Sequence, residues 1–313
     1  MASCVVAVAG GTGKLGRTIV DALVAHDGYK VFILGREATA RSANGLSVDI
    51  LIIDYNDVDS VVDVLEANNI DTVISTLGST SSPKSELALI RAAQRSKITT
   101  RYIPSTWGIS CTPEAAAIFP TIGTKIDYLD VLADTALEYT AVSNGVFLDY
   151  YGYPKAKSYM GSLPRVIDIA ENAAAIPGSG DVPVVFSYSL DVGQFIVALL
   201  SQPRWEKESI IIGDKITWND FLVLAEDVKG VKFKVSHDSL DMLQEGCTTE
   251  LPSQRRLYPK FPKEMLQRTC ATFGILFEKG FFDFNRRGTL NEIFPEIKTK
   301  SVKAFLEETW LSN

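Results

Sequence analysis

Hydrophobic residues in the first half of the chain occur in two alternating patterns. Short continuous apolar runs predict buried strands, and apolar residues spaced by three or four predict amphipathic helices. The predicted strands cover residues 4–9, 29–35, 48–54, 71–78, 100–105 and 137–145, and the predicted helices cover residues 14–26, 58–69, 85–96 and 124–135. Strands buried on both sides and alternating with helices predict an α/β fold with a doubly wound, Rossmann-type parallel sheet.

After about residue 150 this alternation weakens. Residues 150–164 are rich in Gly, Pro and Tyr, which is typical of loops. A helix is predicted over residues 191–203, a further strand of the main sheet over 208–214, and a closing helical region over 289–310. We therefore expect a first domain over residues 1–150, to which 186–214 return. A smaller, mostly helical domain over 151–313 would cover the C-terminal edge of the sheet.

A glycine-rich turn joins the first predicted strand to the first predicted helix. Gly10, Gly13 and Gly16 are spaced by three there, and Thr12, Lys14 and Leu15 lie between and beside them. Glycines allow a tight turn and a close backbone approach, and the start of a helix offers free N–H groups to a diphosphate. These six residues are therefore predicted to bind a dinucleotide, which makes the first domain NAD(P)-binding.

The choice between NAD and NADP depends on the end of the second predicted strand. An acidic residue there usually accepts a hydrogen bond from the ribose hydroxyl of NAD. This chain has Arg36 and then Glu37. A guanidinium pairs with a 2′-phosphate, and Lys14 adds a second positive charge in the glycine turn. We predict NADPH as the cofactor, while Glu37 leaves NAD open.

Short-chain dehydrogenases carry a Tyr-x-x-x-Lys motif on the helix after the fifth strand. Two such strings occur here, Tyr151 with Lys155 and Tyr153 with Lys157. Both follow the sixth predicted strand in the loop-like segment, so we interpret them as coincidental. The helix after the fifth strand carries Lys125, and Thr121 stands where the tyrosine is expected.

Several segments resemble the isoflavone-reductase-like and NmrA-like branch of the atypical short-chain dehydrogenases. They include "GGTGKLG" (10–16), "DTVISTLG" (71–78), "RYIPSTWG" (101–108) and "EYTAVSNGVFLDYY" (138–151), and the resemblance extends over nearly the whole chain. It implies that NADPH delivers a hydride and that Lys125 transfers a proton or polarises the substrate. A lysine ammonium can do either, because burial lowers its pKa.

The ends of the later strands should complete the site, since ligands of such sheets bind there. Asp54 would face the adenine, Leu77, Gly78, Ser79 and Thr80 would pass beside the cofactor, and Asn144 and Phe147 would approach the nicotinamide. Ser105 and Lys125 belong to the same predicted cofactor site. The predicted substrate-binding residues are aromatic: Trp107, Phe147, Tyr150, Tyr151 and Tyr153.

These features favour an NADPH-dependent reductase of a small apolar metabolite, aromatic or polycyclic, in secondary metabolism. The bond reduced would be C=C, C=N or C=O. Two alternatives stay open. One is a non-catalytic NADP(H)-sensing regulator of the NmrA-like kind, and the other is an isomerase or cyclase on the same scaffold.

The composition of the chain bears on nucleic-acid binding, membrane association, metal binding and cellular compartment. The chain has 313 residues, 46% of them hydrophobic and 22% charged, and a net charge of −7, which disfavours nucleic-acid binding. No apolar run is long enough to span a membrane, and the N-terminus does not read as a signal peptide. Four scattered cysteines and two histidines predict no metal site and a reducing compartment, the cytoplasm. The oligomeric state is left open.

Overall fold

The computed structural model describes residues 3–36, 48–78 and 82–311. Its main element is a six-stranded parallel sheet of order β3-β2-β1-β4-β5-β6, so the predicted Rossmann-type sheet is confirmed. Val6 of β1 pairs with Val31 of β2 on one side and with Thr72 of β4 on the other. The strands are β1 (Val5–Ala9), β2 (Lys30–Gly35), β3 (Asp49–Ile52), β4 (Thr72–Ser75), β5 (Arg101–Ile103) and β6 (Glu138–Tyr139).

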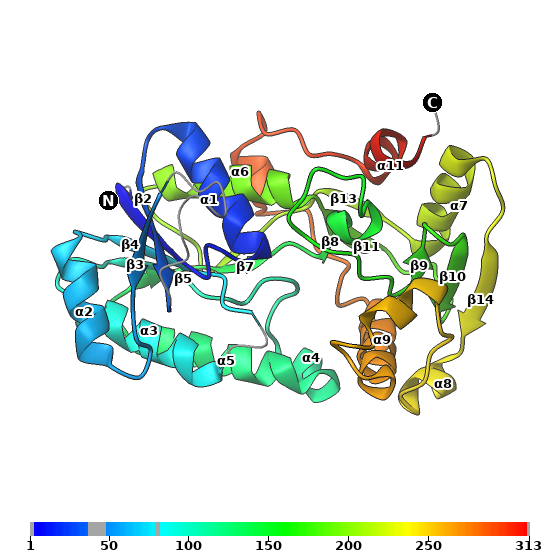
Figure 1. Ribbon diagram of the computed structural model, residues 1–313, viewed down its shortest axis with the longest axis horizontal. Helices are drawn as coiled ribbons and strands as arrows, with labels where there is room; N and C mark the ends of the chain where they lie inside the picture. The colour runs from blue at the N-terminus through cyan, green and yellow to red at the C-terminus, as the bar shows by residue number, and fades with distance from the viewer. Residues whose placement is uncertain (1–2, 37–47, 79–81, 312–313) are drawn as a thin grey trace.

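Helices cover both faces of this sheet (Figure 1). On one face lie α1 (Lys14–His26) and α6 (Ser189–Ser201), and on the other lie α2 (Val58–Ala67), α3 (Pro83–Arg95) and α5 (Pro120–Ala133). Helix α6 belongs to the second half of the chain. It packs closely on α1 at Gly193, where an added Cβ would lie 3.1 Å from the Cβ of Ala22. Residues after 150 thus contribute to the layer that covers the first sheet.

Local sequence explains where these helices begin. Pro83 occupies the first turn of α3, where its missing N–H is not needed, and the Ser82 hydroxyl accepts a hydrogen bond from the Lys84 N–H. The Asp57 carboxylate accepts from the Ser60 N–H and caps α2 in the same way. Helix α5 begins at Pro120. It is four residues longer at its start than the predicted 124–135, and it contains both Thr121 and Lys125.

The second half contains more strand than the sequence indicated. One three-stranded sheet has the order β14-β10-β9 and another has the order β13-β11-β8, beside the helices of this half. These strands are β8 (Val146–Phe147), β9 (Ile167–Asp168), β10 (Ala173–Pro177), β11 (Val184–Ser187), β13 (Asp214–Ile216) and β14 (Lys234–Asp238). The helices are α7 (Trp218–Lys229), α8 (Leu240–Gln244), α9 (Lys263–Glu278), α10 (Leu290–Ile293) and α11 (Val302–Trp310).

The strand predicted over residues 208–214 is shorter and joins the main sheet indirectly. It forms β12 (Glu208–Ile210), which pairs in parallel with β7 (Ala141–Ser143). Only Thr140 separates β7 from the edge strand β6. The predicted strand 137–145 is therefore observed as two short pieces that pair with different neighbours.

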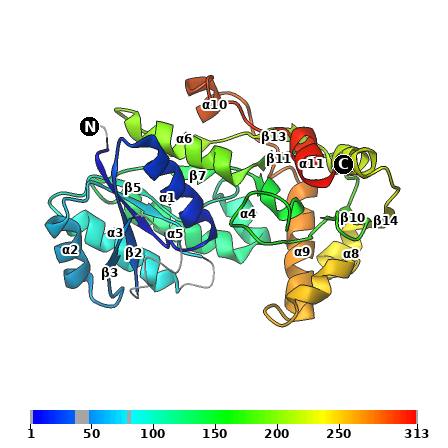
Figure 2. The ribbon, with the colours of Figure 1, turned by 45° about the horizontal axis from the view of Figure 1, so that its top comes forward.

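The two halves meet along the carboxyl ends of the main sheet, where α4 (Pro113–Ile118) and α9 face each other (Figure 2). Helices α4 and α9 are in direct contact. Within residues 3–36, 48–78 and 82–311, no helix combines the length and the apolar composition needed to cross a membrane. The same described part of the chain contains no group of three His, Cys, Asp or Glu side chains placed to hold a metal ion.

Candidate active site

The glycine turn is held by close backbone packing between β1, β4 and α1. Gly10 has a φ of +75°, a conformation that favours glycine. An added Cβ at Gly16 would lie 2.3 Å from the Gly10 carbonyl oxygen and 2.6 Å from the Thr76 hydroxyl. These two glycines are therefore required by the fold itself. Gly13 differs, because its Cβ would meet only the Gly10 carbonyl oxygen, at 3.1 Å.

The start of α1 has the features of a diphosphate-binding site. Its N-cap is Gly13, and within the described chain no side chain caps the helix and no Asp or Glu lies in its first turn. Thr12, Gly13 and Lys14 are exposed beside it, and Leu15 is half-buried. Free N–H groups and the helix dipole both favour an anion at such a terminus. The residues present therefore fit a dinucleotide.

The residues predicted to bind the adenosine end lie at the ends of β2 and β3. Arg36 is exposed, and its charge lowers the pKa of Tyr55, although burial is the larger effect and raises that pKa overall. The sequence analysis did not name Tyr55. Asp54 is also exposed, and its carboxylate accepts hydrogen bonds from the backbone and side-chain amides of Asn56. Glu37, Ser79 and Thr80 lie outside the described residues.

Hydrogen bonds tie the end of β4 to the loop after β5. The Ser105 hydroxyl donates to the Leu77 carbonyl oxygen at 2.8 Å, and the Trp107 indole N–H donates to the Ser75 carbonyl oxygen at 3.0 Å. Thr76, next to Ser75, is the residue packed against Gly10 and Gly16. A continuous set of contacts therefore connects the glycine turn with Trp107. Gly78, beyond Leu77, is exposed.

A buried carboxylate supports this loop from below. Glu86 of α3 is 2% exposed and accepts hydrogen bonds from the Ser75 and Tyr102 hydroxyls and from the Ser105 N–H. Burial raises the pKa of Glu86, and the Ser75, Ser105 and Tyr102 hydrogen bonds oppose this rise. Glu86 thus joins the ends of β4 and β5 beneath the predicted site.

Asn144 is completely buried and has a positioning role. The Asn144 side-chain oxygen accepts a hydrogen bond from the Gly108 N–H at 3.1 Å, and the Asn144 backbone N–H donates to the Gly108 carbonyl oxygen at 3.0 Å. It therefore fixes the segment after Trp107 against the end of β7. The expected approach of Asn144 to the nicotinamide stays a prediction.

A cavity of about 180 Å³ lies beyond Trp107, where the two halves meet. Three predicted aromatic residues, Trp107, Phe147 and Tyr150, line it together with Lys125. The rings of Phe147 and Tyr150 meet edge to face with centroids 6.1 Å apart. Leu15, at the start of α1, belongs to the same hydrophobic cluster as these three aromatic residues. The start of α1 and the aromatic wall of the cavity therefore belong to one hydrophobic core.

Lys125 projects from α5 into this cavity. Its ammonium donates to the carbonyl oxygens of Thr106 and Trp107, at 3.1 and 2.9 Å. Burial lowers the pKa of Lys125, and the nearby Cys111 thiol opposes that shift. Because an ammonium has three donors, one N–H remains for a ligand. Thr121, one turn earlier on α5, is exposed and does not line the cavity.

Tyr151 and Tyr153 do not line the cavity, contrary to the prediction that all five aromatic residues share one pocket. Tyr151 is 3% exposed and packs edge to face against Phe186, Trp218 and Phe221. Tyr153 lies at the surface with 53% of its area exposed. Tyr150 and Tyr151 are neighbours in a 3₁₀ turn, η2 (Leu148–Tyr151), and their side chains point to different places.

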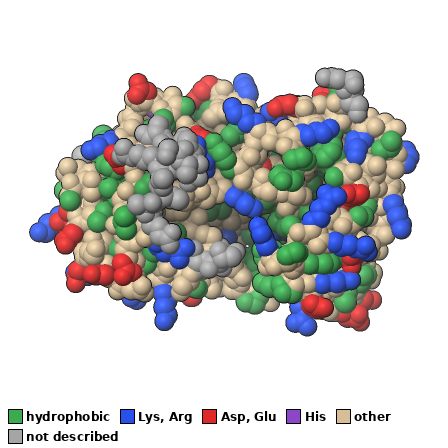
Figure 3. Space-filling model, viewed as in Figure 1, with side chains coloured by type: hydrophobic (Ala, Val, Ile, Leu, Met, Phe, Trp, Pro, Cys, Tyr) green, Lys and Arg blue, Asp and Glu red, His purple; other side chains and the backbone are tan. Residues whose placement is uncertain are grey.

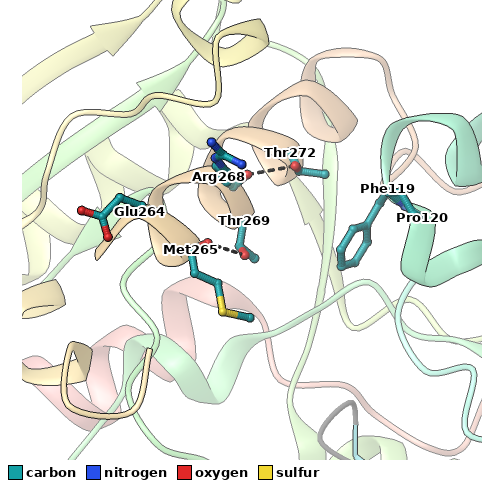
Figure 4. A pocket seen from close by; sticks show the side chains of 7 residues that line it. All are labelled: Phe119, Pro120, Glu264, Met265, Arg268, Thr269 and Thr272. Carbon is teal, nitrogen blue, oxygen red and sulfur yellow. Dashed lines mark hydrogen bonds between the residues drawn. The ribbon is translucent and has the colours of Figure 1, made fainter. Parts of the chain in front are cut away.

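Most of the far wall of the cavity was missed by the sequence analysis. It comes from segments distant in the chain and includes Phe119, Ile122, Arg165, Phe273, Leu276 and Phe282. Phe119 also lines a second, open groove of about 550 Å³. Glu264, Met265, Arg268, Thr269 and Thr272 of α9 line that groove on one side, and Phe119 and Pro120 line it on the other (Figure 4). The larger groove lacks Lys125 and the strand ends, so the smaller cavity is the candidate active site.

Comparison with known proteins identifies the family. The model of the NmrA-like family matches residues 2–258. The chain belongs to the NmrA-like family. Oxidoreductase BOA1 of Botryotinia fuckeliana is 36% identical over 297 residues, which cover 93% of this chain and 95% of that protein. Isoflavone reductase homolog P3 of Arabidopsis thaliana is 26% identical over 245 residues, 74% of this chain and 76% of that one.

Solved structures of named reductases share the fold. The binary complex of leucoanthocyanidin reductase with NADPH from Vitis vinifera has a TM-score of 0.77 and 18% identity, over 98% of this chain and 100% of that one. The predicted resemblance to isoflavone-reductase-like proteins is therefore confirmed. This NmrA-like chain is an oxidoreductase, as its named relatives are. The roles of individual site residues stay predictions.

Proposed function

We propose that this NmrA-like oxidoreductase uses NADPH to reduce a small apolar metabolite, aromatic or polycyclic, in secondary metabolism. The observation that carries the proposal is the position of Lys125, in a largely aromatic cavity whose aromatic residues share a hydrophobic core with Leu15 at the uncapped start of α1. The solved relative bound to NADPH supports the choice of cofactor. Arg36 and Lys14 supply the positive charges that a 2′-phosphate requires.

Each part of the chain has a distinct task in this proposal. The glycine turn and the start of α1 hold the diphosphate, and Arg36 holds the 2′-phosphate. When bound, NADPH supplies the hydride. Lys125 donates a proton, or a hydrogen bond, to the substrate atom on which negative charge develops. Trp107, Phe147 and Tyr150 enclose the apolar part of the substrate and exclude water.

We assign the cofactor to residues 1–150, with 186–214 returning to that part, and the substrate to residues 151–313 together with the strand ends. We also place the protein in the cytoplasm. Two hydrogen bonds support the site assignment: Lys125 donates to the Trp107 carbonyl oxygen, and the Trp107 indole donates to the Ser75 carbonyl oxygen. Together they hold the ammonium beside the carboxyl end of β4. A screen of aromatic and polycyclic metabolites for substrate-dependent NADPH oxidation tests the proposed function.

The screen needs two companion measurements. Calorimetric titration with NADPH and NADH measures the cofactor preference independently of any substrate. The K125M variant, run on every active compound, shows whether oxidation depends on the candidate active site. If NADPH binds but no compound oxidises it, while cofactor binding alters association with another protein, the protein is a sensor. Conversion of a compound without net NADPH consumption would instead indicate an isomerase or cyclase.

A further inference from the structure

Arg165 is a cation in the wall of the cavity, and no acidic side chain among the described residues pairs with it. It lies in the segment just before β9 and lines the cavity opposite the strand ends. Among the described residues no hydrogen bond or ion pair involves Arg165, and its Nε atom is buried without an acceptor. A buried guanidinium donor left without an acceptor is unfavourable, so such a group indicates a missing ligand.

Aromatic rings hold this guanidinium in place. Its central carbon lies 3.8 Å from the ring centroid of Phe273 in α9 and 6.0 Å from that of Tyr150. A ring stacked on one face of a guanidinium leaves the N–H donors free, because they lie in its plane. Arg165 therefore has its position fixed by packing while its hydrogen-bonding capacity remains unused.

The charge balance of the cavity is one-sided. Lys125 and Arg165 both line it, and none of the described lining residues is Asp or Glu. The carboxylates nearest Arg165 in sequence have other partners: Asp168 accepts hydrogen bonds from Ser253, and Glu171 forms an ion pair with Arg256. Lys and Arg side chains also lie along the central hollow of this face in Figure 3. Two cations in a largely apolar and aromatic cavity favour an anionic ligand.

The two cations are not equivalent. The Lys125 ammonium already donates to two carbonyl oxygens, which leaves it one free N–H. Arg165 can offer two parallel N–H groups, the geometry that matches a carboxylate. We propose that the substrate of this cavity carries a carboxylate on its aromatic or polycyclic ring and that Arg165 binds that carboxylate. This inference rests on the proposed function and adds the chemical class of the substrate.

The test compares two ligands that share a ring and differ in charge, 2-naphthoate and 2-naphthamide. Calorimetric titrations with and without NADPH use wild type, R165M, R165K and R268M, the last a control in the outer groove. We expect wild type to bind the naphthoate about tenfold or more tightly than the amide, as for a hydrogen bond to a charged group. R165M should bind both ligands as wild type binds the amide, and R165K should keep part of the preference.

Several results would overturn the proposal. These are equal affinities in wild type, a preference that survives in R165M, a preference lost only in R268M, and failure of both ligands to bind. Thermal unfolding checks that R165M is folded, and R165Q replaces it if it is not. The NADPH titration in the same series separates the two proposals, because loss of NADPH binding contradicts the proposed function without affecting the comparison of naphthoate with naphthamide.

Discussion

The ammonium of Lys125 lies 2.9 Å from the carbonyl oxygen of Trp107, whose indole N–H in turn donates to the carbonyl oxygen of Ser75. One aromatic residue thus connects the cationic group on α5 to the end of β4. The backbone carbonyl orients the ammonium, and the indole anchors the loop that presents this carbonyl. Among the described residues only carbonyl oxygens accept from the Lys125 ammonium, so no carboxylate there neutralises its charge.

Replacing Lys125 tests this arrangement directly. We expect K125M to lower turnover about hundredfold or more, as for loss of general acid–base assistance. NADPH affinity should change little, because the glycine turn and Arg36 lie elsewhere. T121A, an exposed position on the same helix, is the matched control and should retain wild-type turnover. Wild-type turnover in K125M, measured on any active compound from the screen, would remove Lys125 from the mechanism.

The pH dependence of turnover should report the same group. Burial lowers the pKa of Lys125 from its ordinary value of 10.5, so the ammonium loses its proton at a lower pH than an exposed lysine does. If the protonated form is required, kcat falls as the pH rises, with a midpoint below 10.5. K125M should lack this alkaline limb. An activity that increases through this range would mean that the neutral amine acts as a base.

Substitutions of two glycines in the turn should affect cofactor binding and folding stability separately. Gly13→Val should leave the fold intact, because the φ of −80° at Gly13 suits any residue and an added Cβ meets only one atom. It should abolish NADPH binding, because the branched side chain would stand where the diphosphate approaches the backbone. Gly16→Ala should destabilise the protein, since its Cβ would overlap the Gly10 carbonyl oxygen. Gly123→Ala in α5 is the control, with its nearest neighbour at 3.9 Å. Calorimetry and thermal unfolding measure both effects, and normal NADPH binding by Gly13→Val would contradict the site.

Arg36 should determine the cofactor preference. We expect R36A to weaken NADPH binding about tenfold to hundredfold, which corresponds to the roughly 1.5–3 kcal/mol of a hydrogen bond to a charged group. NADH binding should hardly change. K234A, which removes an exposed charge from β14, serves as the control. Equal loss of both cofactors in R36A would show that the residue supports the fold and does not read the 2′-phosphate.

Glu86 should make stability depend on pH. Burial raises the folded-state pKa of Glu86 above its ordinary 4.5. The contribution of the protonated form to stability is therefore complete below about pH 4.5 and is lost as the pH rises through the folded-state pKa. The amide of E86Q does not titrate, so the stability of E86Q relative to wild type should increase as the pH rises. Urea unfolding over this range, with E264Q at an exposed site as the control, measures the difference.

Local patterns in the sequence were sufficient to predict the main sheet and the position of the glycine turn. Strands such as Val5–Ala9 are continuous apolar runs, and the turn that follows depends on residues adjacent in sequence. The small sheets of the second half lack such a pattern. β10 (Ala173–Pro177) is mostly alanine, and β14 (Lys234–Asp238) is largely polar and exposed. Neither composition distinguishes a strand from a loop.

The candidate site was only partly predictable for a related reason. Lys125 and Trp107 could be found because they follow predicted strands. Arg165 and Phe273 are more than 100 residues apart, and their contact exists only through the tertiary packing of α9. Tyr150 and Tyr151 show the limit most directly, since two adjacent residues of the same type reach the cavity and the core respectively. Composition cannot distinguish the two tyrosines, whereas the 3₁₀ turn directs their side chains to different places.

The cavity is completed late in synthesis, after the whole of the main sheet. All six strands of the main sheet emerge from the ribosome before residue 150, so the nucleotide-binding half has its sheet early. Phe273, Leu276 and Phe282 follow more than 100 residues later, and they lie beyond residue 258, where the match to the family model ends. A nascent chain therefore has the glycine turn in place well before it has a complete cavity wall.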